Sequence, residues 1–475
     1  MGQPFAYVTS GSSNTVYGYT IDSVTGALTE IAGSPFPTGN EPITVVATPS
    51  GKFVYVTNYI DSTISAYSLN GRSGVLTPLG GPPFATGPNP FSIDISPSGK
   101  FLYTANDNYY GGGTPGVSAF QINGVTGALT PVNGSPFAAG TEPISLAFTP
   151  SGRYLYVSDP GTGTIFAFTV NSDGSLTQVT GSPYPAGSYP FNLAVTPSGK
   201  FLYVPNSDSG NISAYSINST TGALAPISGS PFVTGGSPPS VAVTPSGEFL
   251  YVAGGSSNEV FAFRINRATG ALTPVLGSPF PAGDYPYDIT VSSSGQFVYA
   301  TDVDGGQVSG YSINASTGAL APLEDSPFTV GSSPYSIAFA NPAVKACGAL
   351  NVSAEATLAP GPYTRQSRGS ELWNETLTIT NGVTPISGPL SVVLENLPSS
   401  TTTLSGTYPG LTTTYCFSAA GNYVVPIDSL IPPANDDTLL PGEALSVPFV
   451  FATTGGSGVE PTHYKPLLIS GTLDK

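Results

Sequence analysis

The sequence has few charged residues and very little histidine, cysteine or methionine. Charged residues make up 8% of its 475 residues, against about 25% in an average globular protein. Its 28 acidic residues outnumber its 12 basic residues, which gives a formal net charge of −16. This balance excludes nucleic acid and anionic membranes as partners, because both attract clusters of lysine and arginine. No apolar run approaches the roughly 18 residues of a membrane-spanning helix, so no transmembrane segment is predicted.

The two cysteines, Cys347 and Cys416, both lie late in the chain. They are compatible with a reduced cytosolic pair and with a disulfide. A composition rich in serine, threonine, tyrosine and glycine and poor in lysine favours an exported protein, secreted, periplasmic or at the cell surface, and with it the disulfide. No signal peptide is visible, and Met1-Gly2 is interpreted as a start placed on a mature chain whose export signal has been removed.

Glycine and proline are abundant, with 58 and 48 copies, and the chain has 26 tyrosines and 24 phenylalanines. This composition excludes helical bundles and indicates many short strands joined by turns. The hydrophobic share of 39% argues against disorder.

One stretch, PSGKFVYVTN at residues 49–58, recurs along the first 342 residues. Near-copies begin at residues 97, 150, 197 and 245, and a weaker one begins at residue 293. A Thr-Gly-Ala-Leu turn and a Gly-Ser-Pro-Phe sequence recur with it. A proline also recurs at intervals of about 48 residues, a period that indicates repeated structural units. These prolines are Pro42, Pro90, Pro143, Pro190, Pro238, Pro286 and Pro334.

Between these markers, apolar and polar residues alternate with period two, as in ISAYSL at residues 64–69, which predicts β-strands. Four antiparallel strands in a unit of this length are typical of a propeller blade. The chain starts with the second strand of a blade at Phe5 and ends its repeats with an unpaired first strand at residues 335–339. Pairing these two fragments completes a seventh blade and leaves no exposed sheet edge. The predicted fold is therefore all-β, with a seven-bladed β-propeller over residues 1–342.

The repeated YVTN sequence with its PSGK turn resembles the YVTN-repeat and lactonase-like superfamily of seven-bladed propellers. The resemblance covers residues 1–342 and implies one of two broad roles. One is lactone chemistry, as in 6-phosphogluconolactonase and muconate cycloisomerase, and the other is an extracellular role like that of surface-layer proteins. Muconate-type members are expected to use histidine, arginine and glutamate, but the single histidine here is His463, outside the repeats.

Residues 343–475 lose the repeat and form the second predicted domain. Strand-like runs at residues 371–380, 390–397 and 445–451 predict a β-sandwich, and the segment resembles the immunoglobulin-like modules of bacterial exported proteins. Cys347 and Cys416, with Trp373 between them, are loosely similar to the immunoglobulin pattern.

The face of the propeller that carries the variable loops is the expected binding site, because function usually lies in loops that vary on a regular scaffold. The basic residues of the repeats map to the opposite face, which carries short, uniform turns. Carboxylates suit a cation such as calcium, and exposed tyrosines suit a glycan or a protein. The structural alternative is that acidic loops keep the protein soluble. The ligand-binding candidates are Glu41, Tyr59, Asp107, Tyr109, Tyr110, Glu142, Tyr189 and Tyr285.

Two further pairs of carboxylates are candidates for chemistry. Asp302 and Asp304 lie in DVDGG, a sequence weakly similar to a calcium loop that lacks its distal glutamate; no other cofactor is predicted. Asp94 and Asp288 interrupt columns of small residues on the innermost strands. In the central channel they could act in acid/base catalysis or hold a cation, or they could simply bind backbone groups and channel water.

The sequence therefore predicts an exported binding or surface-assembly protein that uses its acidic, tyrosine-rich loop face. The expected partner is a protein or glycan at the cell surface, or a second copy of the chain. The alternative is a lactonase-type hydrolase acting on a neutral lactone through an aspartate or a metal-bound water. A phosphorylated lactone is not expected, because the loop face has no cationic donor for its phosphate. A passive structural spacer is the third interpretation.

Overall fold

The computed structural model describes residues 4–111 and 113–341 and, beyond them, only the backbone of strands between Leu350 and Ser470. The chain divides into two compact units: Gln3–Asn341, and Pro342–Lys475 grouped with Met1–Gly2. In the described part of the chain, no helix has the length and apolar character needed to cross a membrane.

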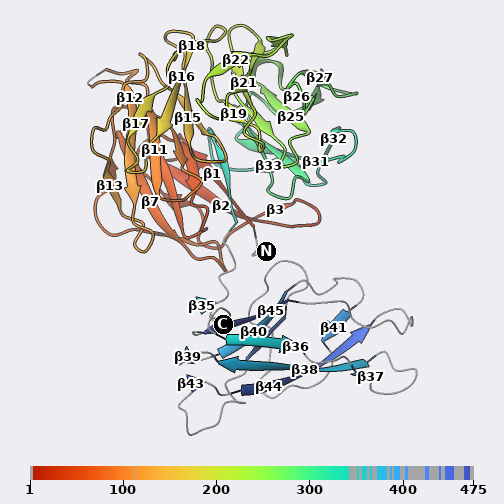
Figure 1. Ribbon diagram of the computed structural model, residues 1–475. Coiled ribbons are helices and arrows are strands. Elements are labelled where there is room, and N and C mark those ends of the chain that lie inside the picture. The colour runs from red at the N-terminus through yellow and green to blue at the C-terminus, as the bar shows by residue number, and fades with distance from the viewer. Residues whose placement is uncertain are drawn as a thin grey trace. The chain divides into compact units, whose positions relative to one another are not determined.

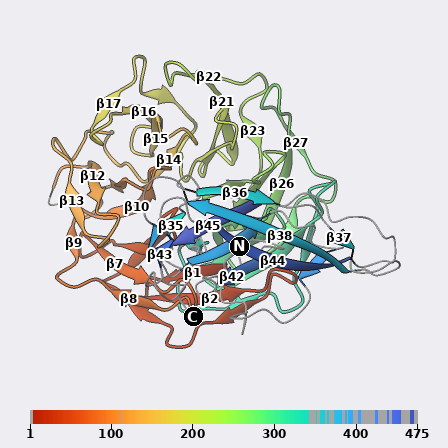
Figure 2. The same ribbon diagram turned by 60° about the horizontal axis from the view of Figure 1, so that its bottom comes forward.

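The first unit is a ring of seven antiparallel sheets, the blades, which follow one another around a common axis (Figures 1 and 2). The first strands of neighbouring blades contact each other and are therefore the innermost. We number the blades in the order of these strands. They are β5 (Pro42–Ala47), β10 (Pro90–Ile95), β14 (Ser145–Phe148), β19 (Ala194–Val195), β24 (Val241–Val243), β29 (Pro286–Val291) and β34 (Ile337–Ala340).

Each first strand pairs with a second strand, and each second strand pairs with a third. In the same blade order, the second strands are β6 (Phe53–Asn58), β11 (Phe101–Asn106), β15 (Tyr154–Asp159), β20 (Phe201–Asn206), β25 (Phe249–Gly254), β30 (Phe297–Asp302) and β1 (Phe5–Ser10). The third strands are β7 (Thr63–Leu69), β12 (Gly116–Ile122), β16 (Thr164–Val170), β21 (Asn211–Ile217), β26 (Glu259–Ile265), β31 (Gln307–Ile313) and β2 (Thr15–Ile21). A 3-10 turn, η1 (Gly255–Ser257), precedes β26.

The fourth, outermost strand is interrupted in most blades. Its pieces are β8 (Leu76–Pro78) and β9 (Phe84–Ala85), β13 (Leu129–Pro131), β17 (Leu176–Gln178) and β18 (Tyr184–Pro185), β22 (Leu224–Pro226) and β23 (Phe232–Val233), β27 (Leu272–Pro274) and β28 (Phe280–Pro281), β32 (Leu320–Pro322) and β33 (Phe328–Thr329), and β3 (Leu28–Glu30) and β4 (Phe36–Pro37). The serine of the Gly-Ser-Pro-Phe sequence lies in the break. In blade 3, Ser182 Oγ accepts a hydrogen bond of 2.9 Å from the backbone N–H of Ala167 on β16. The serine thus replaces the missing strand partner of the third strand.

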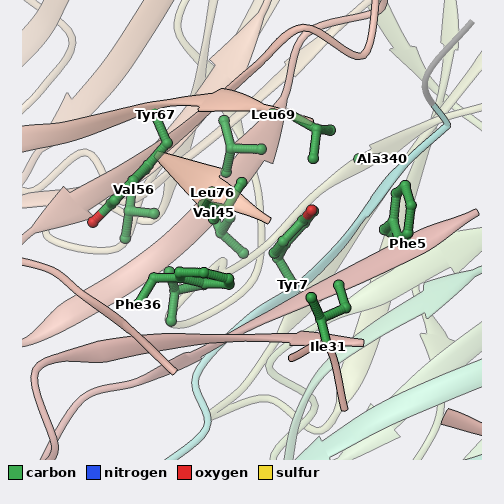
Figure 3. Packing of buried hydrophobic residues seen from close by; sticks show 12 residues of the cluster. Phe5, Tyr7, Ile31, Phe36, Val45, Val56, Tyr67, Leu69, Leu76 and Ala340 are labelled. Atoms are coloured by element: carbon green, nitrogen blue, oxygen red, sulfur yellow. The ribbon is translucent and has the colours of Figure 1, made fainter. Parts of the chain in front are cut away.

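The second strands form the core between blades, because their alternating side chains reach the two neighbouring sheets. On β6, Val54 and Val56 pack in the same cluster as Tyr7 and Ile31 of blade 7. Figure 3 shows this cluster, in which side chains from blades 7 and 1 point toward one another. Tyr55 lies in a different cluster, which it shares with residues of blade 2. The FVYV pattern is therefore buried on both sides.

The last blade closes as predicted. β34 pairs antiparallel with β1, with Phe5 opposite Ala340 and Val8 opposite Ile337. A strand from residues 337–340 thus completes the sheet that begins at residue 5, and the seven-bladed prediction is confirmed.

The second unit is also built of strands. β35 (Leu350–Asn351), β45 (Lys465–Ser470), β40 (Leu390–Glu395) and β42 (Tyr423–Pro426) form one sheet. β36 (Ala356–Pro360), β37 (Thr364–Arg365), β38 (Leu372–Asn381), β44 (Ala444–Thr453) and β41 (Thr402–Leu404) form another, and β39 (Ile386–Ser387) pairs with β43 (Thr438–Leu439). β38, β40 and β44 lie where the sequence predicts strands. The immunoglobulin-like sandwich stays a prediction, and Cys347 and Cys416 lie outside the described residues.

Candidate functional site

A cavity of about 200 Å³ lies on the axis of the propeller, between the innermost strands. Its wall is made by residues at the beginning of each first strand or just before it, so every blade contributes to it. The residues that follow the seven repeat prolines form a ring around it: Ile43, Phe91, Ile144, Phe191, Pro239, Tyr287 and Tyr335. Both predicted catalytic candidates, Asp94 and Asp288, also line this cavity.

The polar residues that directly follow this ring in the sequence form a hydrogen-bonded chain across blades 3 to 6. Ser145 Oγ donates to Asn192 Oδ1 at 2.9 Å, and Asn192 Nδ2 donates to Ser240 Oγ at 3.0 Å. Ser240 Oγ in turn donates to Asp288 Oδ1 at 3.0 Å. The chain orients the Asp288 carboxyl, whose second oxygen, Oδ2, accepts a hydrogen bond of 3.1 Å from the backbone N–H of Ile337.

Burial raises the pKa of Asp288 to about 6, although hydrogen bonds from Ile337 and Ser240 favour the charged form and lower it in part. These hydrogen bonds give Asp288 the structural role that the sequence left open, because they join blades 5, 6 and 7. Both oxygens of Asp288 accept these hydrogen bonds, and Asp288 is among the residues that line the cavity. At neutral pH it is mainly a carboxylate, although its burial favours the protonated form.

Asp94 lies on β10, in blade 2, on the other side of the ring from blade 6. Its Oδ1 accepts a hydrogen bond of 2.7 Å from the backbone N–H of the next residue, Ile95. Burial raises the pKa of Asp94 to about 7, and backbone hydrogen bonds from Ile95 and Phe148 lower it only in part. Burial therefore raises the pKa of both carboxyls in this cavity toward neutral pH, the range in which a general acid or a general base works best.

Aromatic rings close the loop-face end of the cavity, a feature that sequence reasoning missed. Phe91 and Phe191 meet edge to face with ring centroids 5.5 Å apart, and Phe191 meets Tyr287 at 5.6 Å. Tyr287 meets Tyr335 at 5.6 Å. These rings come from blades 2, 4, 6 and 7 and contact one another around the axis. The signal in the sequence that could have found these rings is the aromatic residue directly after the repeat proline of these blades.

The structure separates the predicted loop-face residues into buried and exposed ones. Tyr59 is buried, and its hydroxyl donates to Asp107 Oδ2 at 2.7 Å. The ring of Tyr110 packs on it, with centroids 5.8 Å apart. Asp107 is also buried, and its Oδ1 accepts the backbone N–H of Tyr109 at 2.8 Å. Tyr59 and Asp107 thus support the loop, whereas Tyr109 and Tyr110 are 69% and 64% exposed.

Three other candidates share an unusual backbone. Glu41, Tyr189 and Tyr285 each precede a repeat proline and have φ angles of 54°, 57° and 56°. Residues other than glycine rarely adopt this left-handed region, and a bulky side chain there is a genuine outlier. Tyr189 and Tyr285 are 38% and 37% exposed. Their rings stack on Phe191 and Tyr287 at 6.0 and 6.4 Å, so they extend the aromatic closure of the cavity onto the loop face. The remaining candidate, Glu142, is half-buried.

The calcium candidates do not form a ligand set. Asp302 is fully buried, its Oδ2 accepts a hydrogen bond of 2.7 Å from Ser309 Oγ, and its Oδ1 has no partner. Asp304 is exposed. Within the described residues, no group of three or more carboxylate, histidine or cysteine side chains could hold a metal ion. Calcium at this loop stays a prediction.

Comparisons with known proteins agree on the architecture of the first unit. The family model for "Lactonase, 7-bladed beta-propeller" matches residues 2–145, 136–238 and 234–339. No curated protein is significantly similar to the chain in sequence. Among solved structures, a candidate 6-phosphogluconolactonase from Bacteroides uniformis is 22% identical with a TM-score of 0.62, covering 71% of this chain and 99% of that one.

Two further structures are similar. A candidate 6-phosphogluconolactonase from Bacteroides fragilis is 22% identical, with a TM-score of 0.62 over 71% of this chain and 98% of that one. The periplasmic gluconolactonase of Pseudomonas aeruginosa is 18% identical, with a TM-score of 0.60 over 72% and 99% of the two chains. At these identities the likeness shows the fold alone.

Proposed function

Because the chain belongs to the family of lactonase seven-bladed β-propellers, we propose that it hydrolyses a small, uncharged lactone in its central cavity. One observation carries the proposal: Asp94 and Asp288 line the same cavity, and burial raises the pKa of each toward neutrality. A general acid and a general base work best when their pKa values lie near the working pH.

The cavity limits the substrate in two ways. Its volume of about 200 Å³ is below the roughly 300–1,000 Å³ of sites for drug-sized ligands, so a single lactone ring suits it better than a disaccharide. None of the described residues that line it carries a positive charge. A phosphorylated lactone would find no cationic donor there and would be repelled by the carboxylates, so a neutral lactone is favoured over 6-phosphogluconolactone.

In the proposed reaction, the Asp288 carboxylate takes a proton from a water molecule as the water oxygen attacks the lactone carbonyl carbon. The ring C–O bond then breaks, and the protonated Asp94 carboxyl gives its proton to the departing ring oxygen. The product is the open hydroxy acid, and exchange of one proton each with solvent restores the two carboxyls. The Ser240 hydroxyl orients Asp288 through its 3.0 Å hydrogen bond.

A second candidate function is extracytoplasmic binding or surface assembly through the loop face, with a protein, a glycan or a second copy of the chain as partner. The exposed rings of Tyr109 and Tyr110 favour it, because contiguous exposed aromatic surface is typical of interaction sites. Export of the protein is part of this second proposal.

Titration of the acid released from neutral five- and six-membered lactones tests the hydrolase proposal. Asp94→Asn and Asp288→Asn are each expected to lower kcat about 10²–10⁴-fold, the usual loss on removing a general acid or base. Asp325→Asn, on an exposed residue outside the cavity, is the matched control and should keep full activity. Equal activity of all three variants, or faster turnover of 6-phosphogluconolactone than of neutral lactones, would reject the proposal.

A further inference from the structure

A second cavity lies at the outer edge of blade 1, beside the break between β8 and β9 (Figure 2). Its volume is about 270 Å³. Its wall comes from residues 65–67 of β7, from residues 78–84 around the break, and from residues 37–39, which lead from blade 7 into blade 1. It shares no lining residue with the central cavity, so it is a separate site.

The sequence of blade 1 differs from that of the other blades at this break. In the other six blades a serine stands before a proline, whereas blade 1 has Pro82 before Pro83. Each serine Oγ accepts a hydrogen bond of 2.8–3.1 Å from a backbone N–H of the third strand. The serine backbone N–H also donates, at 3.0–3.1 Å, to the carbonyl oxygen three residues earlier. These serines are Ser34, Ser135, Ser182, Ser230, Ser278 and Ser326.

Pro82 can make neither hydrogen bond, because proline has no hydroxyl and no backbone N–H. The two backbone groups at the corresponding positions are the N–H of Ala66 on β7 and the C=O of Leu79. The Leu79 N–H donates to the Ala66 C=O at 2.9 Å, so the Ala66 backbone faces the break as its counterparts do. Among the described residues, neither the Ala66 N–H nor the Leu79 C=O has a hydrogen-bond partner across the break.

These two groups are also accessible. Ala66 and Leu79 are half-buried and line the second cavity, whereas the residues at their positions in the other six blades are buried. Gly80 and Gly81 add no side chain to the break, and the space around their Cβ positions is open. Backbone donors and acceptors require partners, so the cavity offers one unused donor and one unused acceptor to a ligand.

The separation of the two missing partners selects the ligand. In serine, the hydroxyl oxygen and the backbone nitrogen are joined through two carbon atoms. A vicinal diol holds two oxygens with the same separation, and a hydroxyl can both accept and donate. One hydroxyl can therefore accept from the Ala66 N–H while its neighbour donates to the Leu79 C=O.

The wall of the cavity limits the rest of the ligand. None of the described residues that line it is charged, which favours a neutral molecule. Its volume of about 270 Å³ is below the roughly 300–1,000 Å³ of sites for drug-sized ligands, so the ligand is compact. Pro37, Pro78 and Pro83 supply apolar surface for its carbon atoms.

We infer that the outer edge of blade 1 carries a binding site for a neutral vicinal diol of the size of one sugar ring. The Ala66 N–H and the Leu79 C=O bind its two hydroxyls in place of the serine that the other blades have. The site goes beyond the proposed hydrolysis and does not depend on it.

Titration of the full chain with trans-cyclohexane-1,2-diol, followed by ligand-observed NMR, tests the inference. The matched ligand is trans-cyclohexane-1,4-diol, whose hydroxyls are too far apart to bind both groups. It should bind about two- to twelvefold more weakly, the range that corresponds to one hydrogen bond of about 0.5–1.5 kcal/mol. If the 1,2-diol does not bind, water alone fills the cavity and the inference is wrong.

Substitutions of Pro82 locate the bound diol. Pro82→Ser restores the serine of the other blades, and its hydroxyl and N–H should occupy both groups and abolish binding. Pro82→Ala restores the N–H alone and should weaken binding about two- to twelvefold. Pro274→Ser, on an exposed proline of β27 outside the cavity, is the matched control and should keep full affinity. Thermal unfolding of Pro82→Ser should occur at the wild-type temperature or above, which excludes unfolding as the cause of lost binding.

A variant of the central cavity separates this site from the hydrolase proposal. Asp94→Asn should lose hydrolysis and still bind the 1,2-diol, so either proposal can fail alone. Equal binding of the two diols, or unchanged affinity in a folded Pro82→Ser variant, would overturn the inference. Loss of diol binding in Asp94→Asn would place the diol in the central cavity and overturn it as well.

Discussion

The hydroxyl of Tyr299 donates a hydrogen bond of 2.6 Å to the backbone carbonyl oxygen of Gly26, a residue 273 positions away in the sequence. Tyr299 lies on β30 in blade 6, and Gly26 lies in the turn between the third and fourth strands of blade 7. An equivalent tyrosine-to-glycine hydrogen bond joins each of the remaining pairs of neighbouring blades. These bonds are Tyr7 to Gly74, Tyr55 to Gly127, Tyr103 to Gly174, Tyr156 to Gly222, Tyr203 to Gly270 and Tyr251 to Gly318. Each bond satisfies a buried carbonyl and fixes the spacing between two blades.

Gly26→Ala tests the close approach of the Gly26 turn to the neighbouring blade, which the hydrogen bond from Tyr299 requires. Gly26 has a φ of 76°, and a Cβ atom there would lie 2.6 Å from Phe297 Cδ1. The left-handed backbone costs about 1–2 kcal/mol for alanine, and the overlap adds about 1–3 kcal/mol. Gly33→Ala is the matched control, because Gly33 has a φ of 89° and open space around its Cβ position.

Calorimetric unfolding of both variants measures the difference. We expect Gly26→Ala to lower the free energy of unfolding by more than Gly33→Ala, and the excess is the cost of the overlap. Equal losses in the two variants would mean that the turn moves away from Phe297 freely and that the bond does not fix the blades.

Sequence reasoning reached the fold because the repeat carries its own period. A unit of about 48 residues with four strand-like runs specifies a blade, and the incomplete units at Phe5 and at residues 335–339 specify the closure. The bonds between blades could not be predicted in the same way. The tyrosine of one repeat and the glycine of the next are 67 positions apart in the pair Tyr7 and Gly74, so no local pattern links them.

The candidate site was predictable only in part, because contacts between different blades decide which of its side chains are buried. Asp94 and Asp288 stand out because carboxylates replace small residues in a repeated column, and the structure brings both to one cavity. Tyr59 looks like an exposed loop residue in its own repeat. It is buried because the loop of the next blade places Tyr110 and Asp107 against it, and the burial of a loop residue depends on such neighbours.

The rate of lactone hydrolysis should depend on pH as a bell-shaped curve. The proposed reaction needs Asp288 deprotonated and Asp94 protonated, and their pKa values are raised to about 6 and about 7. kcat/KM should therefore rise as the pH increases through about 6 and fall as it increases through about 7. Asp288→Asn should remove the acidic limb from the activity that remains, and Asp94→Asn the basic limb. A flat profile between pH 5 and pH 8 would contradict the assignment.

Asp302→Asn should stabilise the propeller at neutral pH. Three other second strands end in Asn58, Asn106 and Asn206, and Asn58 Nδ2 donates hydrogen bonds of 2.9 Å to Thr63 and Ser65. Asp302 Oδ1 has no hydrogen-bond partner, and a carboxylate cannot donate as the Asn58 amide does. Burial raises the pKa of Asp302 from 3.8 to about 6, so the folded state binds a proton more tightly than the unfolded state.

The sign of the effect follows from proton linkage. Below about pH 3.8 both states are protonated and the raised pKa has no cost; as the pH rises through about 6, the folded state loses stability relative to the unfolded state. The substitution should therefore change little near pH 3.5 and add about 1–3 kcal/mol to the free energy of unfolding at pH 7. Asp304→Asn, on the exposed neighbour, should leave thermal unfolding unchanged at both values. A stabilisation by Asp302→Asn that is equal at pH 3.5 and pH 7 would rule out protonation as its cause.

Phe91→Ala should widen the range of lactones that the cavity accepts. The Phe91 ring lines the cavity and meets Phe191 at 5.5 Å and Tyr59 at 5.9 Å, so its removal opens the aromatic closure toward the loop face. Discrimination against one extra methylene in an apolar site is worth about 10–200-fold. We expect kcat/KM for an alkyl-substituted lactone to rise about tenfold or more relative to the unsubstituted ring. Phe261→Ala, on β26 and outside the cavity lining, controls for a general loosening of the fold and should keep the original ratio. If the ratio of kcat/KM values is unchanged in Phe91→Ala and its thermal stability equals that of the control, the Phe91 ring does not limit the size of the lactone. The polar residues that line the cavity would then determine which lactone is accepted.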